Sequence, residues 1–293
     1  MSISDRLRRF DDYQQRHRRL RFPVAVLKKF SDDQGGSLAA LIAYYGFVSV
    51  FPLLLVFVTV LGFVIHGDPA EQARVLNGTL GQIPLLKVPL TSHSLSGSPT
   101  ALAAGLIGSL LAGMGIMSAT QNAFNRIWQV PRTERPSFLK SRGRGVVMLV
   151  VLGALNVFSS AAAGFATAAG HGLPADLAGV VVAFAANVVL FLAAFSLLTA
   201  ADIEVRDLMP GVLVGAAGWQ IIQHLGGFWA KKVAHETALY GEFGLVLGLL
   251  AVLYLGARVV LLAAEINVVR AHKLWPRSLF APPPPPERSD VPG

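Results

Sequence analysis

Cysteine is absent from this 293-residue chain, and charged residues make up only 14% of it. Without cysteine there is no disulfide scaffold and no cysteine-based zinc site, iron–sulfur cluster or nucleophile. So few charges, beside 53% hydrophobic residues, contradict the surface composition of an ordinary soluble protein. The composition therefore indicates a membrane protein.

The apolar residues occur in six blocks, each of about the length that a membrane-spanning helix needs, which is about 20 residues. Alternation with a period of two is missing, and the blocks are longer than the strands of a membrane barrel, so helices are the structure that satisfies every backbone group in lipid. We predict an all-α membrane protein. Its six transmembrane helices are expected at about residues 38–65, 100–118, 145–169, 177–200, 208–228 and 243–269.

The segments outside this transmembrane domain (38–270) differ in character. Residues 1–37 are basic and polar, so we expect no cleaved signal peptide. Five side chains recur among their arginines at near-helical spacing, namely Ile3, Leu7, Phe10, His17 and Leu20. This pattern is typical of an amphipathic helix on the anionic headgroups of the inner leaflet, and the alternative is a solvated helix packed on the loops. The proline-rich residues 271–293 are predicted to be a disordered cytoplasmic tail.

Lysine and arginine are distributed unevenly between the two sides of this topology. One side receives 20 of the 25, in residues 1–37, residues 119–144, the connection at Arg206 and the tail. The other side has only Arg74, Lys87, Lys231 and Lys232. The positive-inside rule therefore places both termini in the cytoplasm. Because topology explains the net charge of +8 and no nucleic-acid-binding motif is present, we expect no nucleic-acid partner.

Polar residues within the predicted spans are the best indication of a site. Arg258 lies near the middle of the sixth span, where a charged side chain costs about 2.5–3.5 kcal/mol, and Glu265 follows seven residues later on nearly the same face. Further polar side chains that face the same interior in this interpretation are Asn156, Asn187, Gln220, Gln223 and His224. These side chains predict a polar pathway or a binding site for an anionic headgroup. The alternative is that they only form hydrogen bonds between helices.

Small residues and one proline also shape the predicted helices. The pairs Gly211/Gly215 and Gly244/Gly248 have the GxxxG spacing that lets helix backbones approach closely. Pro52 removes a backbone hydrogen bond from the first span, so we expect a kink there.

Motifs for catalysis are missing from the chain. The seven histidines lie far apart in sequence, with no HxH or HExxH pair, and there is no phosphate-binding loop, Rossmann glycine pattern or GxSxG motif. We therefore expect no metal, no cofactor and no enzymatic activity.

Four ordered motifs resemble the YihY/BrkB family of bacterial inner-membrane proteins. They are Ala43, Tyr44, Tyr45, Ser49, Phe51, Pro52, Leu53 and Leu54 in the first span, AFNRIW at 123–128 after the second, RDLMPG at 206–211 before the fifth, and AEIN at 264–267 in the sixth. The family's usual last motif is AELN, and Tyr240, Gly241 and Tyr254 also fit its final helix. The resemblance covers about residues 32–273.

The resemblance implies a multi-pass protein of the bacterial plasma membrane that is linked to envelope integrity. Some members are proposed to move lipids, and some are labelled ribonuclease BN. By the same resemblance, the candidate functional positions are Tyr44, Tyr45, Asn122, Asn125, Arg126, Glu265 and Asn267. For Asn125 and Arg126, the alternative is a helix end anchored at the membrane surface.

The function that we predict is binding or translocation of a lipid or another amphiphile, with Arg258 meeting an acidic headgroup and Glu265 balancing its charge. A scaffold for envelope partners is the first alternative, and a membrane-attached ribonuclease is the second. Membrane lipids are the expected partners. The sequence leaves open the substrate, the direction and energy of transport, and whether the chain forms a homo-oligomer.

Overall fold

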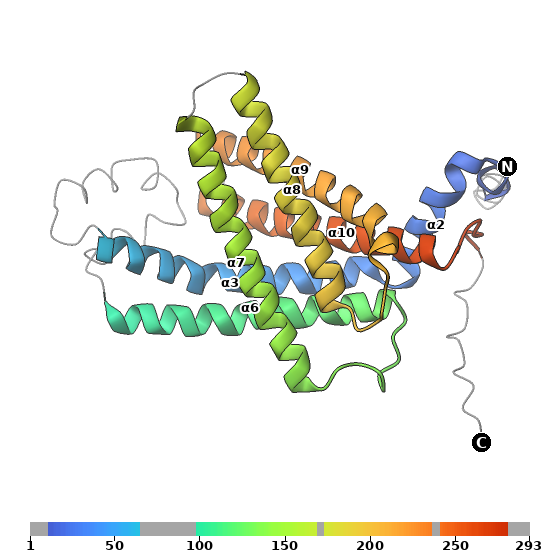
Figure 1. The fold of residues 1–293 in the computed structure, drawn as a ribbon, viewed down its shortest axis with the longest axis horizontal. Coiled ribbons are helices and arrows are strands. Elements are labelled where there is room, and N and C mark those ends of the chain that lie inside the picture. Colours follow the sequence, from blue (N-terminus) through green and yellow to red (C-terminus); the bar gives the residue numbers. More distant parts are fainter. Residues whose placement is uncertain (1–10, 65–97, 169–172, 236–240, 281–293) are drawn as a thin grey trace. The chain divides into compact units, whose positions relative to one another are not determined.

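The computed structural model of the protein describes residues 11–64, 98–168, 173–235 and 241–280. These residues are helical wherever they are regular, and no strand occurs among them, which confirms the all-α class. The helices, in chain order, are α2 (Arg18–Asp32), α3 (Gly35–Val64), α6 (Pro99–Ile127), α7 (Phe138–Ala168), α8 (Leu173–Leu198), α9 (Val205–His235) and α10 (Gly241–Ala271) (Figure 1).

Four of these helices contain a segment that is long and apolar enough to cross a membrane. Within the described residues, the segments are Gly35–Val60, Pro99–Ile127, Leu177–Leu198 and Val246–Ala271. They correspond to the first, second, fourth and sixth predicted spans. The third and fifth predicted spans lie in α7 and α9, which are 31 residues long but carry more polar residues. A count of six spans, with both termini in the cytoplasm, therefore stays a prediction.

The helix boundaries differ from the predicted ones. Helix α6 runs to Ile127 and includes most of the AFNRIW motif, which we placed after the second span. It ends where Gln129 adopts a φ of 54° and the N–H of Val130 donates to the carbonyl of Asn125 at 2.8 Å. This is the Schellman arrangement, which satisfies carbonyls at a helix end. Helices α7 and α9 begin earlier than predicted, and both include polar residues in their first turns.

The N-terminal amphipathic helix stays a prediction, and its described part is interrupted at one residue. His17 has extended backbone and separates α2 from the short helical segment before it. One face of α2 is buried through Ala25 and Val26, which pack with Val269 of α10. This agrees with the alternative of a helix packed on the protein, whereas contact with lipid headgroups stays a prediction. The predicted apolar residues Ile3, Leu7 and Phe10 lie outside the described residues.

The chain divides into two compact units, and one of them comprises Ala40–Ala119 and Ile221–Ala257. In this unit, glycines allow α6 to pack closely on α3. A Cβ atom added to Gly108 would lie 3.0 Å from the Cβ of Pro52, and one added to Gly115 would lie 2.7 Å from the ring of Tyr45. Pro52 is inside α3, as expected, and its predicted kink stays a prediction.

Helix α3 exposes one continuous apolar face in the same unit. Leu41, Tyr44, Val48, Phe51 and Leu55 follow the three- and four-residue spacing of one helix face, and all five are between 39% and 58% exposed. A stripe of this length in water would be an aggregation hazard. In a bilayer it meets acyl chains, which agrees with α3 as a membrane span.

The second unit comprises Met1–Ala39, Thr120–Gln220 and Arg258–Gly293, and in it α9 packs on α10 through glycines. A Cβ added to Gly211 would overlap the Ala263 carbonyl and the Asn267 amide, and one added to Gly215 would lie 2.9 Å from the Ala263 methyl group. The Gly211/Gly215 pair therefore serves close packing, as GxxxG spacing predicts. Gly248, of the other predicted pair, faces open space.

Replacing Gly211 with alanine should therefore destabilise the protein by about 1–3 kcal/mol, the usual cost of overpacking. Gly153→Ala is the matched control, because a Cβ there has no neighbour within 4 Å and alanine favours a helix over glycine. We expect a lower thermal midpoint in detergent only for Gly211→Ala. Equal midpoints for the two variants would contradict the close packing.

Candidate functional site

A polar cluster of the second unit begins at the last turn of α2. The sequence KKFSDD places each lysine four residues before an aspartate, which is the spacing of an ion pair on a helix surface. Both pairs form, one between Lys28 and Asp32 at 2.6 Å and the other between Lys29 and Asp33. The two lysines differ in their surroundings, because the side chain of Lys29 is only 2% exposed and that of Lys28 is 16% exposed.

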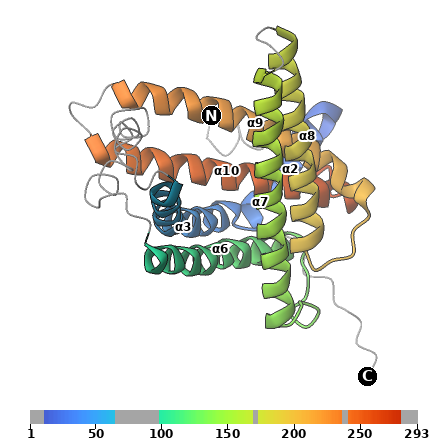
Figure 2. The ribbon, with the colours of Figure 1, turned by 60° about the vertical axis from the view of Figure 1, so that its left-hand side comes forward.

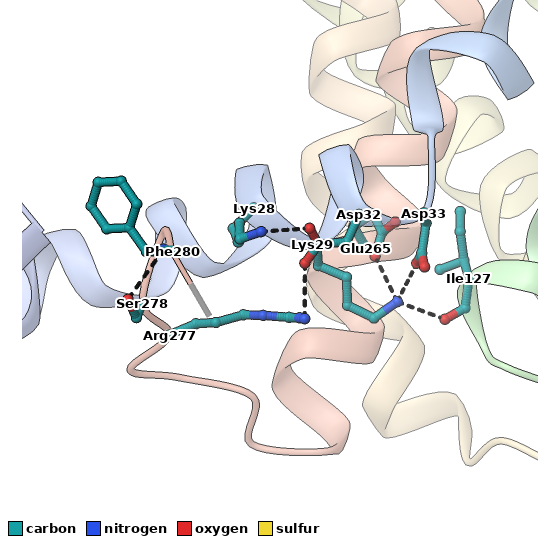
Figure 3. Close-up of polar contacts among 9 residues, drawn as sticks. All are labelled: Lys28, Lys29, Asp32, Asp33, Ile127, Glu265, Arg277, Ser278 and Phe280. Carbon is teal, nitrogen blue, oxygen red and sulfur yellow. Dashed lines mark hydrogen bonds and ion pairs between the residues drawn. The ribbon is translucent and has the colours of Figure 1, made fainter. Parts of the chain in front are cut away.

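Lys29 joins three helices through its ammonium group. Besides Asp33, the Nζ atom contacts the carbonyl oxygen of Ile127 at 2.9 Å and Oε2 of Glu265 at 3.3 Å (Figure 3). Ile127 is the last residue of α6, where carbonyls lack partners within the helix and carry partial negative charge. The ammonium group thus donates hydrogen bonds to Asp33 and Ile127 and forms an ion pair with Glu265. Lys29 therefore fastens α2 to the end of α6 and to α10.

Glu265 is the fully buried member of this cluster. Its side chain is 0% exposed on α10, and Lys29 provides the ion pair described for it. A carboxylate removed from water is costly unless a cation compensates it. The predicted functional residue Glu265 is thus engaged by a lysine that the sequence analysis did not single out.

A second cation reaches the same turn of α2 from the segment that follows α10. The guanidinium of Arg277 lies 2.9 Å from Oδ2 of Asp32. The other carboxylate oxygen of Asp32 pairs with Lys28. Figure 3 shows Arg277, Lys28 and Asp32 beside the Lys29 contacts. Three cations and three carboxylates thus form two groups of ion pairs at the end of α2, one around Asp32 and one around Lys29. Together we call them the α2 ion cluster: Lys28, Lys29, Asp32, Asp33, Glu265 and Arg277.

Two buried asparagines of the predicted motifs hold backbone amides near this cluster. Asn125 accepts a hydrogen bond from the N–H of Ala200 at 2.8 Å, just after α8, and Asn267 accepts one from the N–H of Gly211 at 2.7 Å. Their side chains are 4% and 0% exposed. The RDLMPG and AEIN motifs therefore meet through a specific contact, and Asn125 of AFNRIW binds the backbone of Ala200 just after α8. These two asparagines position helices rather than line an open site.

The other predicted site residues lie apart from the α2 ion cluster. Asn187 on α8 is buried and donates to Gln220 of α9 at 2.7 Å, which is the hydrogen bonding between helices that we left as an alternative. Asn122 is exposed on α6. Arg126 is also exposed and donates to Gln34 at 3.0 Å. Asn156 falls within α7, but its side chain lies outside the described part of the structure.

The aromatic residues of the first motif and Arg258 occupy surfaces of the two units. Tyr44 is 58% exposed on α3, and its ring lies 5.5 Å from that of Tyr45, edge to face. Arg258 is exposed on α10, inside the segment Val246–Ala271, and its guanidinium carbon lies 5.7 Å from the ring centre of Phe30. That distance is within the range of a cation–π interaction. Arg258 is therefore a cation on the surface of a membrane-spanning helix.

The segment after α10 is docked on the N-terminal segment, contrary to a tail that begins at residue 271. Trp275 packs its ring edge to face on Phe22 of α2, at 5.4 Å. Asp11 is buried and accepts hydrogen bonds from the Ser278 hydroxyl at 2.7 Å and from the Leu279 N–H at 2.9 Å. The predicted disorder thus does not begin before residue 281, and residues 281–293 lie outside the described part.

Sequence reasoning missed Lys29, Arg277 and Asp11. The repeated Lys-x-x-x-Asp spacing was a usable signal for ion pairs on α2, but not for their burial. Lys29 and Glu265 are separated by more than 200 residues, and no local pattern links them. Among the described residues, no group of three or more His, Cys, Asp or Glu side chains is arranged to hold a metal ion.

Comparisons with known proteins agree over most of the chain. The family model described as "Virulence factor BrkB" matches residues 26–287. The "Putative ribonuclease-like protein YfkH" of Bacillus subtilis is 23% identical over 85% of this chain and 94% of its own length. The "Inner membrane protein YhjD" of Escherichia coli is 23% identical over 87% of this chain and 82% of its own.

A UPF0761 membrane protein of Acinetobacter baylyi is 20% identical over 84% of this chain, which spans 61% of that relative's length. No solved structure matches the chain significantly.

Replacing Lys29 with methionine should destabilise the protein strongly, by about 3–5 kcal/mol, because Glu265 is left buried without its cation. Lys28→Met is the matched control. Its partner Asp32 keeps Arg277, and a partly exposed pair contributes about 0–1 kcal/mol. The measurement is the thermal midpoint in detergent, followed by tryptophan fluorescence.

The double variant Lys29→Met/Glu265→Gln should regain part of the lost stability, because the uncompensated carboxylate is removed with the lysine. If the two substitutions destabilise additively, the described ion pair is not the reason for the cost.

The docking of the C-terminal segment on Asp11 should depend on acid pH. Burial by itself would raise the pKa of Asp11, but hydrogen bonds from Leu279, Ser278, Gln14 and Gln15 hold the pKa below its ordinary value of 3.8. Because the pKa is lowered in the folded state, the ionised Asp11 carboxylate stabilises the docked C-terminal segment fully above about pH 4. This stabilisation is lost as the pH falls further.

Hydrogen exchange of a peptide that includes Leu279 measures this dependence. The wild type should be protected more than Asp11→Asn from pH 7 down to about pH 4, and the difference should vanish at lower pH. A difference that disappears already between pH 7 and pH 5 would contradict the assignment.

Proposed function

Because the chain belongs to the virulence factor BrkB family, also called YihY/BrkB, we propose that it binds or translocates a lipid or another amphiphile in the bacterial plasma membrane. It is a membrane protein, with four segments suited to cross a bilayer among its described residues. The inner membrane is inferred from relatives such as the one named "Inner membrane protein YhjD". A role in envelope integrity belongs to the same proposal.

The proposed topology has six spans and cytoplasmic termini. Helices α7 and α9, each 31 residues long, would add two spans to the four apolar segments, since about 20 residues suffice to cross the hydrocarbon core. The distribution of lysine and arginine supports this orientation. In it, the α2 ion cluster lies near the cytoplasmic surface.

The observation that carries the proposal is the position of Arg258. The guanidinium lies on the exposed side of α10 within the apolar segment Val246–Ala271, where burial in acyl chains would cost about 2.5–3.5 kcal/mol. An anionic headgroup supplies a bidentate partner for a guanidinium and leaves its acyl chains in the bilayer. The ring of Phe30, a buried residue of α2, lies 5.7 Å from the guanidinium carbon and places Arg258 at the junction of α2 and α10.

Glu265 has a different role from the one that we first assigned to it. We first predicted that it balances the charge of Arg258, but its carboxylate is fully buried and paired with Lys29. We therefore propose that Arg258 contacts the amphiphile and that Glu265 holds α10 in position. In this proposal the protein has no enzymatic activity.

One alternative has a specific observation in its favour, because the relative from Bacillus subtilis is named as ribonuclease-like. Metal-dependent cleavage of RNA by the purified protein would support that activity. A scaffold without transport is the other alternative, and it agrees with the docked N- and C-terminal segments.

Replacing Arg258 with leucine should slow movement of a fluorescent phosphatidylglycerol across reconstituted vesicles by about tenfold or more. A charge-assisted hydrogen bond contributes about 1.5–3 kcal/mol, and each 1.4 kcal/mol is a factor of ten. Arg258→Lys should keep part of the rate. Arg270→Leu is the matched control, since Arg270 is exposed in the last turn of the same helix.

Lipid that copurifies with each variant, identified by mass spectrometry, separates binding from transport. Loss of anionic lipid from Arg258→Leu alone supports binding even if the wild type moves no lipid. Unchanged flux and unchanged copurifying lipid in Arg258→Leu would reject the proposal.

A further inference from the structure

The first turn of α7 carries the two most exposed large apolar side chains of the described chain. Phe138 is 74% exposed and Leu139 is 80% exposed, whereas the other large hydrophobic side chains reach at most 65%. They follow the connection from α6, at residues 128–137, and open a helix of 31 residues. Side chains of this size are normally covered by protein or by lipid.

The opposite side of the same turn is attached to the protein. Gln121 of α6 donates to the carbonyl of Ser141 at 2.9 Å, and the Ser141 hydroxyl donates back to Gln121. Gly145 and Met148 continue this side as buried residues. The turn is therefore held in a fixed orientation, and Leu139 points away from the attachment because it lies about 160° around the helix from Ser141.

The exposed side continues along α7 as an apolar stripe. Leu139, Gly143, Val146 and Val150 follow helical spacing, and Val146 and Val150 are 39% and 65% exposed. A Cβ added to Gly143 would have no neighbour within 4 Å. The stripe thus has bulky side chains at its first turn and smaller ones further along, and it is continuous from the helix end into the apolar part of α7.

Positive charge is concentrated at the same end of the stripe. Residues 132–144 contain five cations and one acidic residue, namely Arg132, Arg135, Lys140, Arg142, Arg144 and Glu134. Arg142 lies over the ring of Phe138 at 4.8 Å, and Arg144 reaches the carbonyl of Thr199 at 3.4 Å, where α8 has ended. Lys140 and Arg132 are exposed.

The first turn of α7 also extends beyond its neighbour α8. In both ribbon views the start of α7 reaches past the end of α8 (Figures 1 and 2). Arg144 contacts Thr199 directly after the end of α8, and α7 begins six residues before Arg144. A turn that is apolar at its tip, cationic around it and fixed on one side has the chemistry of a membrane–water interface.

We propose that the first turn of α7 is an anchor on the anionic leaflet of the membrane. Phe138 and Leu139 enter the boundary between headgroups and acyl chains, and Lys140 and Arg132 contact the phosphates of acidic phospholipids. The charge of residues 132–144 complements such lipids, and the apolar stripe continues in the direction of the acyl chains. This surface is separate from Arg258 and does not require that the protein transports anything.

The absence of cysteine makes the anchor directly testable in the full-length chain. Leu139→Cys carries a polarity-sensitive fluorophore, and Thr133→Cys, an exposed position in the connection before α7, is the matched control. Both are reconstituted in nanodiscs of phosphatidylcholine alone or with phosphatidylglycerol. Quenchers in the lipid should reduce the Leu139 signal, and iodide in the water should reduce the Thr133 signal.

Phosphatidylglycerol should strengthen lipid quenching at Leu139. Replacing Lys140 and Arg132 with glutamine should abolish this strengthening, with about a fivefold loss of preference for the acidic lipid per cation. Lys140→Arg should retain it.

Three outcomes would overturn the anchor. Quenching of Leu139 by iodide, as at Thr133, means that the turn lies in water. Protection from both quenchers means that protein covers it, as in a homo-oligomer. Equal lipid quenching with and without phosphatidylglycerol means that acidic headgroups are not recognised.

Discussion

A single buried ammonium group determines how the N-terminal segment joins the helices of its unit. Lys29 is almost inaccessible, and the three partners of its ammonium group come from Asp33 directly after α2, from the end of α6 and from α10. Each partner is positioned by a different part of the chain, so the buried charge is fully compensated only when all three are assembled. A buried charge without its partners costs several kcal/mol, so this contact makes partial assembly unfavourable. We therefore expect the helices of this unit to assemble only together with the α2 ion cluster.

The family motifs acquire a physical meaning from the same assembly. Asn125 binds a backbone N–H just after the end of α8, Asn267 binds one within α9, and Glu265 forms an ion pair with Lys29. Gly211 must lack a side chain, because the Asn267 amide and the Ala263 carbonyl occupy that space. Short polar side chains and a glycine are what such contacts require, which explains why residues far apart in sequence form one recognisable set. Their role is to position helices.

The sequence was informative where one segment determines its own structure. Helix content and four of the apolar segments follow from block length, and the packing of Gly211 follows from its spacing. The burial of Lys29 could not be predicted, since it depends on Ile127 and Glu265, which lie about 100 and more than 200 residues away. Similarly, α6 continues through AFNRIW because the motif is buried against α2 and the residues after α8, a gain that local hydropathy does not record.

Buried polar groups and polar groups on the surface are therefore considered separately when function is assigned. Asn187 and Glu265 have partners inside the protein, and a ligand would have to displace these partners at the cost of a buried polar group. Arg258 and the first turn of α7 are instead exposed on the surface, where lipid can contact them without breaking the fold. Cations at a lipid-facing surface favour binding of acidic headgroups, whereas cations in the interior stabilise one arrangement of the helices. Recognition of an amphiphile thus belongs to the surface of this protein, and its buried charges serve to hold that surface in place.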